Sequence, residues 1–288
     1  MQLAMVQDRI LPLEDVHEAY FDRGMFFGDG VYEVLRSYNG KIFALDDHLQ
    51  RFGNSLDAVE IDGIDVASIR QHVITAFEKS GIVNAKIYFH ITRGTAPRDL
   101  LDSEDLKANF FMTVTELEDK SSEKQRGISV SVHPDWRWQR CAIKSLNLLG
   151  NVLARRDAAK KGCQEAIFVD DAGLITEGAA SSFFAVYDSS GGLPQGSNPT
   201  VRLQTSSLVK NILPSVTRTY VIRAAQALGL AVVEESFTCQ QVPEAKELFV
   251  ASTTRDIVPV VSFDGQAIGG GQPGEWTLKL MREFATFV

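Results

Sequence analysis

The sequence contains little cysteine and no concentrated positive charge. Its three cysteines, Cys141, Cys163 and Cys239, form neither a disulfide framework nor a CxxC pair, and none has His, Asp or Glu at metal-ligand spacing. We interpret them as small buried apolar residues and expect no metal site. The formal net charge of -8, without a basic block, argues against nucleic acid and anionic membranes as partners.

Long apolar runs are also missing. No stretch approaches the roughly 18 consecutive apolar residues of a membrane span, and the first residues, MQLAMVQDRILPL, lack the basic segment and apolar run of a secretory leader. We therefore expect a globular protein of the cytoplasm that has no membrane partner. With 288 residues, of which 44% are hydrophobic, the chain can form one large or two ordinary domains.

Residues 1–115 have the pattern of a small α+β domain. The segment GVYEVLRSYNGKIFAL (30–45) mixes β-branched and aromatic residues around an Asn-Gly turn, which predicts a hairpin. A helix should follow with Asp46 or Asp47 as its N-cap, and a second helix is expected over 68–81, where a glycine ends it. The stretches AKIYFHITRG and NFFMTVTEL predict two further strands.

Residues 116–126, ELEDKSSEKQR, are polar and charged without apolar periodicity, which is typical of an exposed linker. Beyond it, residues 127–288 alternate strands and helices and predict a larger second domain, so the fold class is α/β (α+β). A surface loop is expected at SSGGLPQGSNP (189–199). A helix should begin at Ser215 or Thr217, and another is indicated by apolar helical spacing at Leu149, Val152 and Leu153.

Lys144 is the first candidate for chemistry. It stands in CAIKSLNLLG between an apolar pair and the expected start of a helix, away from other charges. Apolar neighbours and the positive end of a helix both favour the neutral amine over the ammonium. A neutral amine is a nucleophile toward aldehydes.

Three later segments can bind a flat, phosphorylated ligand. Glu177 in LITEGAASS ends a strand among small residues, where its carboxylate can hold a protonated ring nitrogen. LPSVTR places free N–H groups at a helix start, which attracts phosphate, and ASTTRD supplies three hydroxyls after an apolar strand. Each feature also has an ordinary interpretation, as an exposed strand end, a helix cap or a turn. Other conspicuous residues are interpreted as structural or packing residues: His48, His90, His133, Trp136 and Trp138.

Several motifs, in order, carry a resemblance to a known family. They are RGMFFGDGVYEV, DHLQRF, IYFHITRGTAPR, IKSLNLLGNVLARRDAAKKGCQEAI, TEGAASSFF, LPSVTR, LFVASTTRDIVPV and GEWT. Together they resemble the fold type IV pyridoxal-phosphate aminotransferases, most closely the D-amino acid aminotransferases, over nearly the whole chain. The resemblance implies two domains, the larger with a barrel-like β core, pyridoxal 5'-phosphate as cofactor, amino acids and 2-oxo acids as substrates, and a homodimer.

Carried onto this sequence, the resemblance assigns roles to individual residues. Lys144 would form the Schiff base with the cofactor aldehyde and move a proton, while Glu177 would bind the pyridine nitrogen. The other cofactor residues that it implies are Arg51, Val216, Thr217 and Thr253 at the phosphate and Leu213 beneath the ring. We place the following residues in the substrate site, with the arginine of the 95–101 loop reaching into the neighbouring subunit: Tyr32, Arg36, Arg98 and Thr254.

Whether the enzyme accepts a D- or an L-amino acid depends on the groups that bind the substrate's carboxylate. In the D-amino acid enzymes a histidine follows the loop arginine two positions later, whereas this sequence has Leu100 there, and Arg36 matches an arginine of branched-chain L-amino acid relatives. We expect a transaminase of the D-alanine type with ping-pong kinetics. The alternatives are a branched-chain L-amino acid aminotransferase, an R-selective amine transaminase, an aminodeoxychorismate lyase, and a binding protein that kept the fold.

Overall fold

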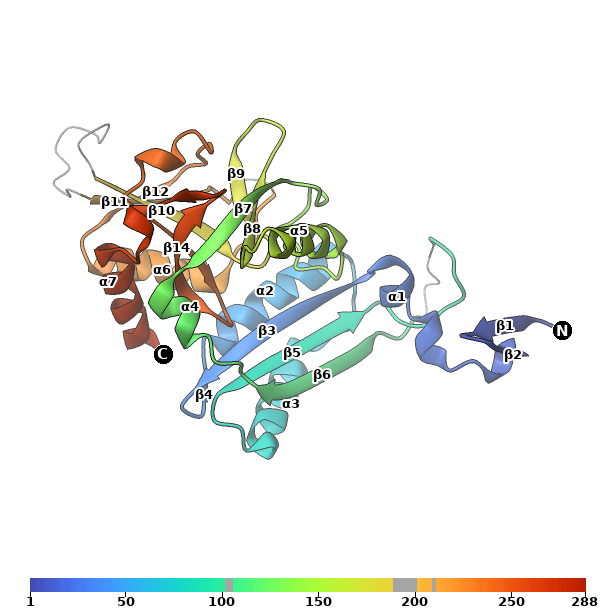
Figure 1. The fold of residues 1–288 in the computed structure, drawn as a ribbon. Coiled ribbons are helices and arrows are strands. Elements are labelled where there is room, and N and C mark those ends of the chain that lie inside the picture. Colours follow the sequence, from blue (N-terminus) through green and yellow to red (C-terminus); the bar gives the residue numbers. More distant parts are fainter. Residues whose placement is uncertain (102–105, 189–200, 209–210) are drawn as a thin grey trace.

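The computed structural model describes residues 1–101, 106–188, 201–208 and 211–288, which form two main sheets (Figure 1). A four-stranded sheet comes from the first part of the chain and a nine-stranded sheet from the second. The mixed α/β architecture expected from the sequence is confirmed, and the larger sheet curls into a half-barrel. The surface loop expected at 189–199 lies outside the described residues.

The smaller sheet is antiparallel, with the strand order β4-β3-β5-β6. Its strands are β3 (Gly30–Tyr38), β4 (Lys41–Ile42), β5 (Ala85–Thr92) and β6 (Asn109–Glu116). The hairpin of β3 and β4 is confirmed, because Asn39 and Gly40 between them take positive φ values of 48° and 82°, as an Asn-Gly turn requires. Alternate residues of β3 face opposite sides, so Tyr32 and Glu33 point away from each other.

Two helices cover one face of this sheet, α2 (Leu45–Ala58) and α3 (Val66–Ser80). Their apolar residues pack against β3 and β5 in a core that contains Phe52 and Phe89. The helix expected at 68–81 is confirmed, and Gly81 ends it with φ 65°.

The N-cap expected for α2 is wrong. Ala44 occupies this position with φ 49° and makes no side-chain cap, whereas Asp46 and Asp47 lie in the first turn. Their negative charges there interact favourably with the positive end of the helix dipole. This explains why aspartates occur at this point although neither is the cap.

The larger sheet has the strand order β12-β11-β10-β13-β14-β7-β8-β9, with β15 paired to β14. Its strands are β7 (Ile128–Pro134), β8 (Glu165–Val169), β9 (Ile175–Gly178), β10 (Ser182–Asp188), β11 (Val201–Thr205), β12 (Ala231–Glu234), β13 (Glu247–Ser252), β14 (Asp256–Phe263) and β15 (Gln266–Ala267). Both faces are buried: Phe183 belongs to one core, while its neighbour Phe184 belongs to the other and stacks on Phe249 at 4.7 Å. The near-continuous apolar sequence of β10 follows from this double burial.

Three helices pack on the larger sheet: α5 (Leu149–Lys160), α6 (Val216–Ala227) and α7 (Glu275–Phe284). The helices predicted for α5 and α6 are confirmed, and Ser215 is the N-cap of α6. Helix α5 contacts β8 through the small residues Ala154 and Ala158. Its larger apolar residues therefore lie outside, and Leu149 is 71% exposed.

The predicted linker at 116–126 contains a short helix, α4 (Ser121–Arg126). Lys124 Nζ lies 2.5 Å from Asp256 Oδ2, and Glu123 Oε2 lies 3.6 Å from Arg255 Nη1, so α4 is held against the start of β14. These partners are distant in sequence, and composition alone did not reveal the helix. The division into domains at 1–115 and 127–288 stays a prediction.

A small separate hairpin, β1 (Leu3–Val6) and β2 (Arg9–Pro12), projects from the rest of the chain (Figure 1). The short helix α1 (Arg23–Phe27) leads from this region into β3. The single-turn 3-10 helices are η1 (Leu13–Asp15), η2 (Glu18–Phe21), η3 (Val242–Glu244), η4 (Gly269–Gly271) and η5 (Ala285–Phe287). Among the described helices, none has the length and apolar character to cross a membrane.

Candidate active site

A cavity of about 580 Å³ has walls from both the smaller and the larger sheet. It brings together seven of the residues assigned to the site: Tyr32, Arg51, Lys144, Glu177, Leu213, Thr253 and Thr254. Val216 and Thr217 follow directly on Ser215, which lines the same cavity. Neither Arg36 nor Arg98 is among the lining residues.

Lys144 is fixed through its backbone and presents its amine to the cavity. Its N–H donates to Ser55 Oγ of α2 at 3.1 Å, and its carbonyl accepts from the N–H of Tyr32 at 2.9 Å. The Nζ atom lies 4.3 Å from the centre of the Tyr32 ring, and no described residue accepts a hydrogen bond from it. The main chain is therefore held in place, while the side-chain amine has no hydrogen-bond partner among the described residues.

Arg51 lies on the buried side of α2 and is held by a carboxylate inside the protein. Its Nε and Nη2 donate to the two oxygens of Glu33 at 2.7 and 2.8 Å, and His48 Nδ1 lies 2.9 Å from the same carboxylate. Burial would raise the pKa of Glu33, but the charge of Arg51 and the contact with His48 outweigh it and hold that pKa far below its usual range. Arg51 Nη1 donates to the carbonyl of Pro214 at 3.2 Å, which brings the guanidinium to the start of α6.

The start of α6 has the groups that can bind an anion. Ser215 caps the helix by accepting from the N–H of Arg218 at 3.2 Å, so the N–H groups of Val216 and Thr217 have no acceptor among the described residues. Such free N–H groups and the helix dipole attract phosphate, and the guanidinium of Arg51, held by Glu33, lies near them. Thr253 lines the cavity with its hydroxyl-bearing neighbours Ser252 and Thr254.

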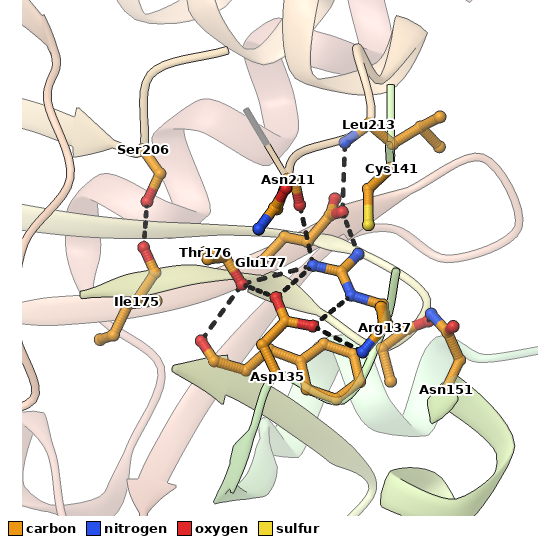
Figure 2. Close-up of polar contacts among 12 residues, drawn as sticks. Asp135, Arg137, Cys141, Asn151, Ile175, Thr176, Glu177, Ser206, Asn211 and Leu213 are labelled. Carbon is orange, nitrogen blue, oxygen red and sulfur yellow. Dashed lines mark hydrogen bonds and ion pairs between the residues drawn. The ribbon is translucent and has the colours of Figure 1, made fainter. Parts of the chain in front are cut away.

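Glu177 of β9 is buried, with one oxygen bonded and one open (Figure 2). Its Oε1 accepts from Arg137 Nη1 at 2.5 Å and from the N–H of Leu213 at 3.1 Å, whereas no described residue donates to Oε2. Burial raises the pKa of Glu177, while the charge of Arg137 opposes this rise. The open oxygen of a carboxylate on the cavity wall can accept a hydrogen bond from a ligand.

Sequence reasoning missed Arg137 and its second partner, Asp135. The Nε and Nη2 atoms of Arg137 donate to Oδ1 and Oδ2 of Asp135 at 2.8 and 2.7 Å, and its guanidinium lies over the Phe168 ring at 4.6 Å. Thr176 donates its hydroxyl hydrogen to Asp135 Oδ2 at 2.9 Å. In PDWRWQR the available signal was the pair of opposite charges, Asp135 before the first tryptophan and Arg137 between the two tryptophans.

Arg36 and Arg98, the two arginines expected in the substrate site, lie elsewhere. Arg36 continues the β3 face of Tyr32 and pairs with Asp256, with 2.5 Å between Nη1 and Oδ1. Arg98 is exposed on the 95–101 loop, with its guanidinium 5.4 Å from the centre of the Phe27 ring. Within the described part of one chain, the structure therefore brings neither arginine into the cavity wall.

An amine, an open buried carboxylate and an anion site around one cavity are the parts that bind and use an aldehyde cofactor with a phosphate. Residues 30–263 match the family model described as Amino-transferase class IV. The chain belongs to this family and is a pyridoxal 5'-phosphate-dependent aminotransferase.

Individual relatives agree with this assignment. The chain is 31% identical to a D-alanine aminotransferase of Staphylococcus haemolyticus over 290 residues, which covers 100% of this chain and 98% of the relative. It is 36% identical to a D-alanine aminotransferase of Bacillus licheniformis over 260 residues, covering 89% and 86%. The solved structure of a branched-chain amino acid aminotransferase of Escherichia coli shares the fold with a TM-score of 0.85 at 23% identity, covering 97% of this chain and 92% of that chain.

The residues present fit the cofactor. Ser182, which lines the cavity and is 3% exposed, has a buried Oγ without a hydrogen-bond partner among the described residues. Such an orphaned hydroxyl is expected where a polar ligand completes the site. Oε2 of Glu177 and Nζ of Lys144 likewise have no hydrogen-bond partner among the described residues, so all three groups can bind polar atoms of the cofactor.

Proposed function

We propose that this protein is a D-amino acid aminotransferase that moves the amino group of a D-alanine-type substrate to a 2-oxo acid. The observation that carries the proposal is the shared cavity, in which Lys144, Glu177 and Arg51 face one space. The D-alanine aminotransferases that match nearly the whole chain support the choice of substrate.

Each residue has a physical task. Bound pyridoxal phosphate supplies the aldehyde that takes over the amino group and the ring that accepts the electron pair released at Cα. Lys144 Nζ would take the proton from Cα and deliver it to the former aldehyde carbon of the cofactor in the first half-reaction, and would carry a proton in the opposite direction in the second, a general acid–base step. Arg51, the first N–H groups of α6 and Thr253 bind the phosphate, while Leu213 packs beneath the ring.

Glu177 keeps a proton on the ring nitrogen through its open oxygen. A charge-assisted hydrogen bond of this kind is shorter and stronger than a neutral one. With the proton in place, the ring withdraws electrons more strongly from Cα. We therefore expect Glu177 to contribute to the rate of proton removal more than to binding.

We also propose that Tyr32 and Arg98 bind the substrate carboxylate, assisted by Thr254 and Arg36, and that Arg98 acts in the site of a second subunit. Exposed apolar side chains support this homodimer. Leu100 and Leu101, beside Arg98, are 79% and 83% exposed. A second group of exposed apolar side chains consists of Trp138 and Val152, which line the cavity, and their neighbours in sequence Trp136, Leu149 and Leu153. Contact between these two surfaces, repeated by twofold symmetry, would cover both and place Arg98 in the partner's cavity.

The cytoplasm is the proposed location. Cys141, Cys163 and Cys239 are free thiols, as is usual in a reducing compartment.

A spectroscopic experiment tests the substrate class. The cofactor-loaded protein is mixed in turn with D-alanine, L-leucine and R-1-phenylethylamine, and the visible absorption band of the cofactor is followed. The proposal predicts that D-alanine removes the band and that pyruvate restores it. Removal by L-leucine alone or by the amine alone would replace the proposal with the corresponding aminotransferase, and pyruvate release from aminodeoxychorismate would indicate the lyase. A chain that binds the cofactor but reacts with none of these would be a binding protein.

A further inference from the structure

We propose that Asp135 is a positioning residue of this aminotransferase: it fixes Arg137 and supplies the second negative charge of the ring-nitrogen site. This inference rests on the proposed binding of the cofactor ring at Glu177. Asp135 is not among the residues that line the cavity, and it is linked to Glu177 through Arg137 (Figure 2).

Asp135 holds Arg137 in one orientation. Both carboxylate oxygens of Asp135 accept from Arg137, at 2.8 Å from Nε and 2.7 Å from Nη2, and the side chain of Asp135 is only 4% exposed. Nη2 also donates to the carbonyl of Asn211 at 2.9 Å. With this edge occupied, Nη1 is the nitrogen that reaches Glu177 Oε1, at 2.5 Å. Bidentate pairing of this kind fixes the plane of a guanidinium.

The fixed guanidinium decides which oxygen of Glu177 remains open. Arg137 and the N–H of Leu213 both bind Oε1, so Oε2 of this cavity-lining residue has no described donor. A rotated Arg137 would compete for Oε2 and for the position of the ring nitrogen. Asp135, which stands two positions before Arg137 in the sequence, prevents this rotation. Asp135 is itself held by Thr176, whose hydroxyl donates to Oδ2 at 2.9 Å.

The charges of the cluster give a second, independent reason. Asp135 and Glu177 carry one negative charge each and Arg137 one positive charge, so the cluster has a net charge of about -1 before the cofactor binds. The other titratable group beside it, Cys141, is a neutral thiol, because burial raises its pKa to about 11. A protonated ring nitrogen brings this net charge to zero. Without Asp135 the cluster would start neutral and become positive on binding, among buried side chains where an uncompensated charge is costly.

If the negative charge of Asp135 stabilises the protonated ring nitrogen, its removal should weaken cofactor binding in a way that a purely structural role of Asp135 would not. Replacing Asp135 by Asn removes the charge but leaves Arg137 paired with Glu177, so no isolated buried charge results. The apoprotein should therefore still fold, with a lower melting temperature because one of the two hydrogen bonds between Asp135 and Arg137 is lost. Binding of pyridoxal phosphate should weaken about tenfold, which corresponds to ~1.4 kcal/mol, and the stabilisation by a saturating concentration of cofactor should shrink accordingly.

The experiment compares two cofactors in apoprotein of the wild type, Asp135→Asn and the control Asp170→Asn. Asp170 accepts N–H bonds in the β8–β9 turn, so the control removes one aspartate charge of the same sheet away from the cavity. Dissociation constants are measured for pyridoxal phosphate and for its 1-deaza analogue, in which carbon replaces the ring nitrogen. We expect Asp135→Asn to weaken only pyridoxal phosphate, so that the preference of the wild type for it over the analogue falls about tenfold, and we expect no change in the control.

A second variant keeps the test decisive if Asp135→Asn does not fold. Thr176→Val is isosteric and removes the hydroxyl that holds Asp135 Oδ2. It should lower the same preference in the same direction, by about twofold to threefold. An unchanged preference in the variants that fold would overturn the role of Asp135, and so would equal weakening of both cofactors. The proposed function fails separately, if wild-type protein neither binds pyridoxal phosphate nor transfers the amino group of D-alanine.

Discussion

Glu33 of β3 and Arg51 of α2 form a buried bidentate ion pair between the smaller sheet and the helix, with 2.7 Å between Oε1 and Nε and 2.8 Å between Oε2 and Nη2. The carboxylate is fully buried, and the guanidinium is 7% exposed. The pair holds the proposed phosphate arginine in position before any ligand arrives, since Arg51 also donates to the carbonyl of Pro214 ahead of α6. Preorganisation of this kind lowers the cost of binding.

Glu33→Gln is expected to destabilise the apoprotein by about 3 to 5 kcal/mol, because it leaves the buried Arg51 without its counter-charge. Phosphate or pyridoxal phosphate should restore part of this loss by neutralising Arg51 from the cavity side. Denaturant unfolding of both proteins, with and without phosphate, measures the effect. An equal loss with and without phosphate would contradict the proposed phosphate contact of Arg51.

The same pair predicts how stability depends on pH. The pKa of Glu33 is lowered in the folded state, so the folded protein releases this proton more easily than the unfolded chain does. The contribution of Glu33 is therefore complete above the ordinary glutamate pKa of about 4.3 and is lost progressively as the pH falls below it. The melting-temperature gap between wild type and Glu33→Gln should be constant from about pH 7 to about pH 5 and should narrow in stronger acid. A gap that widens on acidification would contradict the assignment.

Glu177→Gln should slow transamination by roughly 10²-fold or more, because an amide cannot keep a proton on the ring nitrogen. The Michaelis constant for D-alanine should change much less, since Glu177 lies at the ring and not at the substrate carboxylate. Steady-state kinetics on cofactor-saturated protein separate the two effects. A variant with wild-type turnover would exclude the proposed role of Glu177.

Arg98→Ala should raise the Michaelis constant for D-alanine by about tenfold to a hundredfold, as expected for the loss of a charged hydrogen bond to a carboxylate. Arg36 is already paired with Asp256, so Arg36→Ala tests whether it assists. Unchanged affinity for D-amino acids in both variants would remove both residues from the carboxylate site. Mixing Arg98→Ala chains with Lys144→Ala chains tests whether Arg98 acts in the site of the other subunit. If it does, each mixed dimer should contain one active site that carries neither substitution.

Asp256 is expected to join the two halves of the chain. Its carboxylate accepts from Arg36 and Tyr38 of β3 and from Lys124 of α4, and its φ of 55° is one that Asn also tolerates. Asp256→Asn should therefore keep the backbone but lower the free energy of unfolding by about 2 to 4 kcal/mol. The control Glu275→Gln removes an exposed pair with Lys279 and should leave the unfolding midpoint unchanged. Equal midpoints for the two variants would contradict the joining role of Asp256.

Local patterns in the sequence predicted most elements correctly, because hairpin turns, glycine helix ends and apolar periodicity act over a few residues. They failed where partners are distant. The apolar residues of α5 follow helical spacing, yet the helix packs on β8 through Ala154 and Ala158, and Leu149 stays exposed. The spacing indicates a helix but does not show which of its faces will meet a sheet formed by other segments.

The same limit applies to the site. Lys144, Glu177 and Arg51 were found through motifs in order along the chain, and the structure brings them to one cavity. Asp135 and Arg137 were not found, because their function depends on contacts of Arg137 with β9 and with the segment before α6, which lie 40 and 74 residues further along the chain. No periodicity marks a buried charge whose partner is distant in sequence.

The proposed bond between Lys144 and the cofactor is tested most directly by identifying the lysine to which the cofactor is covalently attached. The cofactor-loaded protein is reduced with borohydride, which fixes the cofactor to the amine that holds it, and is then digested and analysed by mass spectrometry. The account predicts that the added mass lies on Lys144 and that Lys144→Ala protein carries none. Attachment at another lysine, or the same labelling of the Lys144→Ala protein, would contradict it.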